Sequence, residues 1–383
     1  MPLSTHGRTD AGILFHREYH ETGKGRIATP RATIYAGGKE GYDRIESTTD
    51  LQRWLHQSNI HLALICTSPT LTERQALRFT ILLFLATTLY FGFSATAAHS
   101  KDAKIVLVAG KPSHPPRMHE FNAGVQLMAK CLNETPGIDV QFVLNGWPKD
   151  ESVFDGAIAV VFFMDGGGRH EVVGENGRRL KVVDDWAAKG IGLGFMHFGV
   201  EVIADQAGNQ FKRWIGGHYE HMHSCNPIWE PNFTVFPDHP ISRGVKPFQV
   251  KDEWYFNMRF AGDMSGEKAT EIEGLKFVPI LTAAPSDDVR NGPYVYPKGP
   301  YPHIQASKGR AEAMMWTVER PNGGRGFGFT GGHFHDNWAN DSFRRVVLNG
   351  ILWIAKVEVP PSGVKSTVSD ELLNANLDPK NRR

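Results

Sequence analysis

Cysteine is scarce in this sequence: there are three among 383 residues, and two of them, Cys131 and Cys225, lie after residue 97. Two cysteines are too few to build the disulfide framework on which small secreted domains depend. In an oxidising compartment they could pair with each other, but we favour two free thiols.

An excess of charge of one sign is also missing, because 42 Lys and Arg residues balance 41 Asp and Glu residues. The two signs are interspersed, so the sequence has no basic stripe of the kind that binds nucleic-acid phosphates, and we expect no nucleic-acid partner. A helical HExxH motif and paired CxxC motifs, two common zinc-binding patterns, are absent as well.

The sequence has one long apolar run, Phe79–Phe93, and its 15 residues fall short of the roughly 20 that span a bilayer. Arg78 precedes it, and the small residues Ala95-Thr96-Ala97 that follow form the pattern cut by signal peptidase. We therefore predict a signal peptide over residues 74–97 and export to the periplasm or the outside of the cell. A retained membrane anchor and a buried core helix are the alternatives.

Residues 1–73, before this run, are polar and have no sustained helical or strand periodicity. We predict an unstructured leader. Because a signal peptide belongs at an N-terminus, translation could also start after Met1, for example at a non-Met codon for Leu71, which would leave the leader untranslated.

From Ala98 onward, short β-rich runs alternate with amphipathic helical patterns. The first four predicted strands cover residues 104–110, 140–144, 157–163 and 191–197. This alternation predicts right-handed crossovers and a parallel sheet covered by helices on both faces. The sequence therefore predicts a doubly wound α/β domain over residues 98–360, without a linker or an internal repeat.

After about Gly217 the alternation weakens, and strand-like runs that start at residues 232, 252, 277 and 313 predict a β-rich insertion with antiparallel strands. The apolar positions between Phe343 and Ile354 predict a closing helix capped by Asn340 or Asp341. Residues 361–383 form a polar tail that we expect on the surface.

Histidines and carboxylates follow several of the predicted strands. Ligands of open α/β sheets bind beyond the carboxyl ends of the strands, so these residues are the candidates for a binding site. The candidates for substrate binding are His114, His119, Asp165, His218, Trp254 and His335. One such histidine is usually a surface residue, but several strand ends converge here.

Two histidine pairs have a spacing of two residues, which on an extended chain places both rings on one side. His221 and His223 form one pair, and His333 and His335 form the other. Imidazole and carboxylate groups bind zinc and other first-row ions, so we treat His221 and His223 as candidate ligands of a divalent metal such as zinc. Hydrogen bonding to a polar substrate is the alternative.

The segment GLGFMHFGVE, from Gly192 to Glu201, has the pattern of a sharp turn between a strand and a helix. Class I glutamine amidotransferases carry C-x-G-x-Q at such a turn, and His197, Gly199 and Glu201 stand at the matching positions. Without a thiol no thioester forms, which excludes glutamine hydrolysis by that route. An imidazole at His197 can instead act as an acid, a base or a ligand.

Several of these marks occur in the order found in one family. They are KIVLVAG at Lys104, GLGFMH at Gly192, DHPI at Asp238, DEWY at Asp252, Gly332-His333 and GILW at Gly350. The chain from about Lys104 to Val357 resembles the ThuA-like (trehalose utilisation) family, which shares the flavodoxin-like fold of class I glutamine amidotransferases without their cysteine. The resemblance implies sugar metabolism, of disaccharides or their 3-keto derivatives. The first loop, SHPPRMHEF, and Phe198-Gly199 after the elbow histidine depart from the expected pattern.

Taken together, the residues predict a carbohydrate-active enzyme in which His197, Glu253 and His333 are the leading catalytic or ligand residues. Glu253, beside Trp254 and Tyr255, could be a partly desolvated carboxylate suited to acid or base catalysis, or an exposed strand charge. A His and carboxylate pair permits isomerisation or β-elimination, and with a metal it permits hydrolysis. A non-catalytic sugar-binding protein is the alternative, and the oligomeric state stays open.

Overall fold

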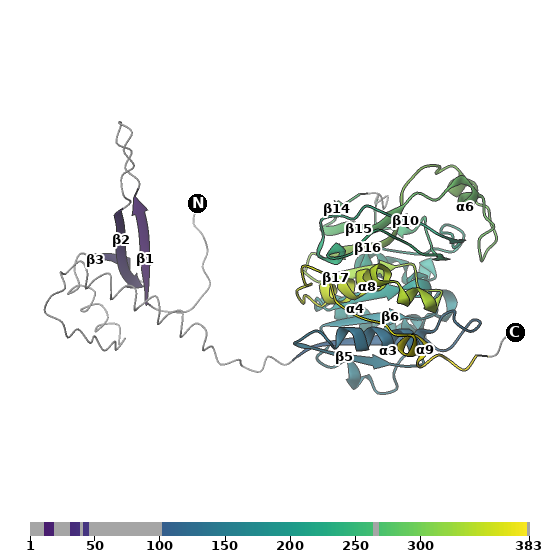
Figure 1. Ribbon diagram of the computed structural model, residues 1–383, viewed down its shortest axis with the longest axis horizontal. Coiled ribbons are helices and arrows are strands. Elements are labelled where there is room, and N and C mark those ends of the chain that lie inside the picture. Colours follow the sequence, from purple (N-terminus) through teal and green to yellow (C-terminus); the bar gives the residue numbers. More distant parts are fainter. Residues whose placement is uncertain (1–10, 19–30, 39–40, 46–101, 263–267, 381–383) are drawn as a thin grey trace. The chain divides into compact units, whose positions relative to one another are not determined.

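The first strand of the α/β domain is β4 (Ala103–Ala109), which is fully buried from Ile105 onward. The computed structural model describes residues 11–18, 31–38, 41–45, 102–262 and 268–380, and the chain divides into two units, Met1–Ala98 and His99–Arg383 (Figure 1). The strand β4 belongs to the second unit, which contains the site described below.

An eight-stranded sheet forms the centre of this unit, in the strand order β14-β15-β16-β17-β7-β6-β4-β5. Its parallel part consists of β5 (Ile138–Val143), β4, β6 (Ala159–Phe163), β7 (Gly192–Met196) and β17 (Arg325–Phe329). The antiparallel part consists of β14 (Thr270–Ile272), β15 (Leu275–Ala283) and β16 (Glu312–Glu319). The doubly wound, mostly parallel sheet with a β-rich extension is therefore confirmed.

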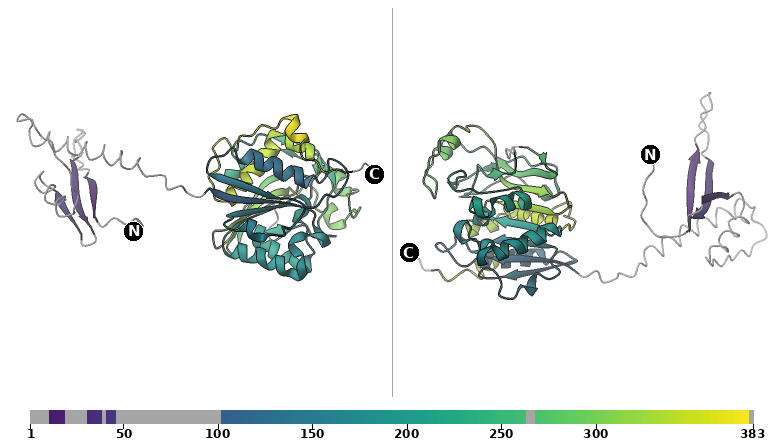
Figure 2. Two further views of the ribbon diagram at one scale, coloured as in Figure 1. Left: turned by 90° about the horizontal axis from the view of Figure 1, so that it is seen from below. Right: turned by 180° about the vertical axis from the view of Figure 1, so that it is seen from behind.

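Helices cover both faces of the sheet. Successive residues of a strand point to opposite faces, so each face contributes to its own core cluster. Ile105 and Leu107 of β4 lie in one core cluster, and Val106 and Val108 lie in another. The first cluster contains α3 (Phe121–Leu132) and α8 (Asp341–Ile354), and the second contains α4 (Arg178–Ala188) and α5 (Asn209–Ile215). Figure 2 (left view) shows helices on the two sides of the strands.

The closing helix α8 begins as predicted, with the Asn340 side chain accepting hydrogen bonds from the backbone N–H groups of Ser342 and Phe343. Three two-stranded ladders accompany the insertion: β8 (Gly217–His218) with β13 (Arg259–Phe260), β9 (Ile228–Trp229) with β12 (Asp252–Glu253), and β10 (Asn232–Phe233) with β11 (Phe248–Gln249). The short helices are α6 (Asp287–Asn291), α7 (Pro302–Gln305) and α9 (Asp370–Asn374).

Part of the predicted leader forms a three-stranded antiparallel sheet, of β1 (Ala11–Glu18), β2 (Arg31–Gly38) and β3 (Gly41–Ile45). The expectation of an unstructured stretch is wrong for these strands. Antiparallel ladders are joined by backbone groups, so they can form where side chains show little periodicity. The other residues of the leader and the run at 74–97 lie outside the described residues.

None of the helices in the described part of the chain is both long and apolar enough to cross a bilayer. Cys131 and Cys225 are buried free thiols. The polar tail differs from the expectation of a loose surface segment, because it contains α9, and its Lys380 is buried against the loop that follows β4.

Candidate metal centre

The carboxyl ends of four strands and one short ladder bring five side chains together. His119 follows β4, Asp165 follows β6, His197 follows β7 and His333 follows β17. Glu253 reaches the same place from β12, and it is 4% exposed. Because the carboxyl ends of parallel strands share one edge of a sheet, residues far apart in sequence meet there.

His119 is the central member of this group. Its Nε2 lies 3.0 Å from Nε2 of His197 and 3.0 Å from Nδ1 of His333. Nδ1 of His333 in turn lies 2.8 Å from Oε2 of Glu253. One ligand-type atom from each of these four buried residues lies within 4.8 Å of the others, and we call them the His–Glu cluster.

The hydrogen-bond partners of two rings indicate where their protons are. Nδ1 of His197 faces the carbonyl oxygen of Thr330 at 2.9 Å, and Nδ1 of His119 faces Oδ1 of Asp165 at 2.9 Å. Both partners accept, so both Nδ1 atoms carry the proton in the neutral ring. Each Nε2 then presents a lone pair, and the two lone pairs face each other across 3.0 Å.

The neutral form of these rings is the favoured one. Burial lowers the pKa of His119 and of His197 well below 6.5, and the neighbouring histidines lower both further. The Tyr255 hydroxyl, 3.2 Å from Nε2 of His197, can donate to that ring. If Nδ1 of His333 carries a proton, it can donate a hydrogen bond to Glu253 or to His119. No proton lies between Nε2 of His119 and Nε2 of His197 when both rings are neutral in this way.

This arrangement fits a divalent cation. Ligand atoms at about 2.0–2.1 Å from a tetrahedral zinc ion lie roughly 3.3 Å apart. The three shortest contacts described above in the His–Glu cluster are 2.8–3.0 Å, and all four ligand atoms lie within 4.8 Å of one another. Ligand histidines usually donate their other N–H to a carboxylate or a backbone carbonyl, as His119 does to Asp165 and His197 does to Thr330. His119, His197, Glu253 and His333 could therefore hold a metal ion.

The backbone around the cluster is unusual, and it is held by an inward carboxylate. His119 and His197 have φ of 49° and 51°, in the left-handed region that residues other than glycine rarely adopt. His197 is the first residue of the 3₁₀ helix η5 (His197–Val200). The fully buried Asp252 accepts hydrogen bonds from the N–H groups of Gly332 and His333, at 2.8 and 3.0 Å, and so positions His333.

Trp254, a predicted substrate-binding residue, points away from the cluster. Along an extended segment side chains alternate, so Glu253 and Tyr255 face the cluster whereas Trp254 faces the opposite side. Its fully buried ring packs at 5.6 Å from Phe329 and 5.8 Å from Phe343 in the core. The prediction for Trp254 is wrong because that indole fills the core.

His335 and His218 are buried but lie outside the cluster. A 3₁₀ helix, η8 (His335–Ala339), begins at His335, so the chain is not extended and His335 does not share a side with His333. Its Nε2 lies 2.8 Å from the carbonyl oxygen of Leu373. His218 pairs in β8 with Arg259, and burial lowers its pKa to about 4. Both predictions of substrate contact are therefore corrected.

The predicted metal ligands His221 and His223 also lie elsewhere. They stand in a turn around Met222, whose φ is 65°, so the assumption of an extended chain fails. His221 is exposed, and the ring of His223 stacks on His303 with 5.4 Å between centroids. Within the described ranges, neither residue belongs to a group of three or more potential ligands.

His114 and Asp165 form the more exposed side of the centre. The His114 side chain is 38% exposed, and its ring stacks on His119 with 3.6 Å between centroids. Asp165 accepts a hydrogen bond from the Ser113 hydroxyl at 3.0 Å as well as from His119. These polar groups are placed where a ligand entering from solvent could contact them.

Three groups that we assign to the site were not predicted as site residues from the sequence: the Thr330 carbonyl, Tyr255 and Glu201. A backbone carbonyl leaves no signal in the sequence. Glu201 does leave one, because it stands at the glutamine position of the C-x-G-x-Q pattern. Burial, together with the negative charge of Glu253, raises the pKa of Glu201 to about 7. Its Oε1 lies 3.2 Å from the position that a Cβ would take on Gly167.

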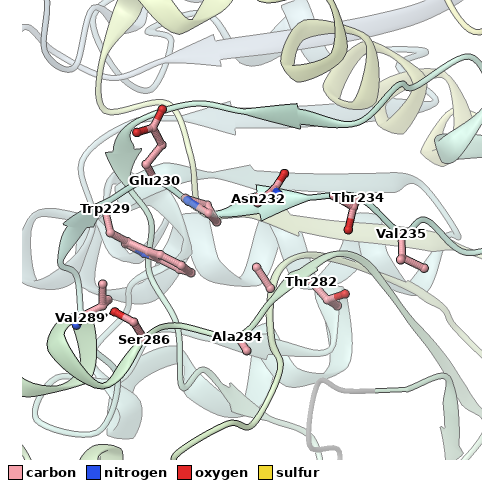
Figure 3. A pocket seen from close by; sticks show the side chains of 11 residues that line it. Trp229, Glu230, Asn232, Thr234, Val235, Thr282, Ala284, Ser286 and Val289 are labelled. Atoms are coloured by element: carbon pink, nitrogen blue, oxygen red, sulfur yellow. Dashed lines mark hydrogen bonds between the residues drawn. The ribbon is translucent and has the colours of Figure 1, made fainter.

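A separate pocket of about 510 Å³ lies between the β9–β10 segment and the end of β15. Figure 3 shows Trp229 and Asn232 among the side chains that line it. None of the four residues of the His–Glu cluster lines this pocket.

Solved structures similar to this chain include two ThuA-like proteins. One, from Parabacteroides merdae, is 19% identical, with a TM-score of 0.42 over 71% of this chain and 94% of that one. The other, from Bacteroides uniformis, is 13% identical, with a TM-score of 0.44 over 68% of this chain and 94% of that one. No curated protein matches the chain.

Residues 105–354, more than half of the chain, match the family described as trehalose utilisation, ThuA. The match contains all five strands of the parallel part of the sheet except the first two residues of β4, and all four residues of the His–Glu cluster. The chain therefore belongs to the ThuA family.

Proposed function

We propose that this protein is a metal-dependent, carbohydrate-active enzyme that acts on a disaccharide or a 3-keto-glycoside. The observation that carries the proposal is the distance of 3.0 Å between Nε2 of His119 and Nε2 of His197, beside Glu253 and His333. Two buried ring nitrogens this close, with no proton between them, are unfavourable unless a cation or a ligand satisfies them. The family supplies the sugar as substrate class.

A divalent ion in the cluster would act as a Lewis acid on a carbonyl or hydroxyl oxygen of the sugar. The protein groups around it have distinct tasks. His119 is oriented by Asp165 and His197 by Thr330, so both rings stay fixed while a ligand binds. Ser113 and His114, at the exposed side, are positioned to bind sugar hydroxyls.

Glu201 is the group that we assign to proton transfer. Its half-buried side chain lies against Gly167, and the negative charge of Glu253 contributes to its raised pKa. A carboxylate there can take the acidic proton next to a keto group, which leads to isomerisation or β-elimination, and can return it as an acid. In this assignment His197, Glu253 and His333 are ligands and Glu201 is the base.

The test is metal content together with turnover. We expect the purified protein to contain about one zinc-like ion per chain, measured by mass spectrometry, and His197→Ala or His333→Ala to lose it. Turnover of disaccharides and of their 3-keto forms should be lost in the same variants. The control is His303→Ala, which changes an exposed histidine stacked on His223.

Two outcomes would contradict the proposal. Wild-type protein without metal after growth in metal-supplemented medium, or unchanged metal content in both variants, would exclude the metal centre. Sugar binding without turnover would instead indicate a non-catalytic sugar-binding protein.

We further propose that the chain is exported, by cleavage after Ala97.

A further inference from the structure

The C-terminal segment from Ser369 to Lys380 lies against the loop that carries His119, more than two hundred residues away in sequence. The carbonyl oxygen of Leu373 accepts from His335, and the Asn374 side chain accepts from Arg117 at 2.8 Å. The backbone N–H of Asp378 donates to Oε2 of Glu120 at 2.8 Å. The segment thus contacts residues 117–120 of the loop that follows β4, and also His335.

Within this segment, Lys380 contacts the backbone of His119 directly. Its ammonium group donates to the carbonyl oxygens of Met118 and His119, at 2.5 and 3.1 Å, and pairs with Glu120 at 3.2 Å. The Lys380 side chain is 7% exposed and that of Glu120 is 1% exposed. The ammonium group also pairs with Oδ2 of Asp378 at 3.8 Å. A buried ammonium with these four partners defines the position of the peptide groups more tightly than a solvated one.

The conformation of the 110–120 loop requires stabilising contacts from outside the loop. His114, Arg117 and His119 all have positive φ, at 61°, 67° and 49°, and none of them is glycine. Residues in this region persist only where surrounding contacts over-determine the conformation. Within the loop itself, the N–H of Arg117 donates to Oε1 of Glu120, so Glu120 joins the loop to the C-terminal segment.

We propose that residues 369–380 form a latch that positions His119, with Lys380 as its positioning residue. The proposal rests on the metal centre proposed above. Because Nε2 of His119 must point into the cluster, a loop released from the latch would lose the ring orientation although the sheet and the other three ligands stay in place. The family match ends at residue 354, so the latch lies outside it.

The test compares Co²⁺ affinity among full-length variants, read from the visible absorption of the bound ion. Removing Lys380 alone leaves the buried carboxylates of Glu120 and Asp378 without their ammonium partner, and Glu120 is the closer of the two, so this change can unfold the protein. The main variant is therefore Lys380→Met combined with Glu120→Gln. The matched control is Lys365→Met, the same change at an exposed position of the tail.

We expect the double variant to bind Co²⁺ about 10–100-fold more weakly, the effect typical of residues that orient metal ligands. Lys365→Met should bind like wild type, and Lys380→Arg, which keeps the charge and the donors, should retain most of the affinity. Far-ultraviolet circular dichroism should be unchanged, which separates loss of positioning from loss of the fold.

A second readout does not depend on the metal. In the metal-free protein, hydrogen exchange of the amides in residues 112–120 should be faster in the double variant than in wild type, with exchange in β6 and β7 unchanged. If wild type binds no Co²⁺ but the loop exchanges faster in the variant, the metal centre is wrong and the latch remains. Equal affinity and equal exchange in both proteins would overturn the latch.

Discussion

The surroundings of Glu201 change the pKa of its carboxyl group. Glu201 lies four residues after His197 and is joined to Tyr219 by an isolated backbone bridge. Burial raises its pKa from 4.5 to about 7, with a contribution from Glu253, so the carboxyl group can exist in both protonation states near neutral pH. A group of this kind is suited to accept and return a proton.

This shift predicts a pH-dependent stability. Because the pKa is raised on folding, the neutral acid is favoured in the native state, and its contribution is complete below pH 4.5 and lost as the pH rises to about 7. In metal-free protein, Glu201→Gln should therefore gain stability over wild type across this window, by roughly 2–3 kcal/mol. Urea unfolding at several pH values measures it.

The control for this experiment is Glu271→Gln, at an exposed position of β14. This substitution makes the same chemical change at a solvent-exposed site outside the His–Glu cluster. A Glu201→Gln variant whose stability relative to wild type is the same at pH 4.5 and pH 7.5 would contradict the raised pKa.

At the scale of elements, the site depends on how closely the turn after β6 approaches the turn after β7. Gly166 follows β6, and a Cβ on it would lie 2.0 Å from the carbonyl oxygen of Phe198 and 2.6 Å from that of Glu201. Gly167 donates its N–H to the Glu201 carbonyl at 2.9 Å. The glycine-rich turn thus supports the chain that carries Glu201.

Gly166→Ala should destabilise the protein by about 1–3 kcal/mol, because two backbone carbonyls cannot move away as a side chain could. The matched control is Gly168→Ala, in the same turn, where the new Cβ would meet only Ile203 Cδ1 at 3.8 Å, an ordinary contact. Denaturant unfolding should separate the two variants. Equal midpoints for both would show that the turn can shift at little cost.

At the scale of the whole molecule, the second unit holds all eight strands of the large sheet, both core clusters and the His–Glu cluster. We predict that a chain that begins at Ala98 folds with the same melting temperature as the full chain and binds the same amount of metal. Thermal unfolding and metal analysis test this. Aggregation or a clearly lower melting temperature would contradict it.

The same residue is the N-terminus that we expect for the native protein, because the proposed cleavage follows Ala97. N-terminal sequencing of protein isolated from its own cells measures it directly. A mature chain that begins near Met1 would contradict export by this signal, and would leave the folding prediction for the second unit unaffected.

Sequence alone determined the architecture of the second unit, because buried parallel strands and amphipathic helices each leave a local pattern. The runs at Lys104 and Gly192 predicted β4 and β7, and the apolar face from Phe343 predicted α8. Strand ends rich in histidine also indicated which edge of the sheet to inspect. His197, Glu253 and His333 come from that reasoning and lie together.

Tertiary structure alone decided which polar residues meet. Spacing of two residues did not place His221 beside His223 or His333 beside His335, because a turn and a 3₁₀ helix replace the extended chain there. His119 became the centre of the cluster through a left-handed backbone and a latch from the far end of the chain. Local sequence patterns report φ and ψ preferences and burial, but long-range contacts select among the conformations that these preferences allow.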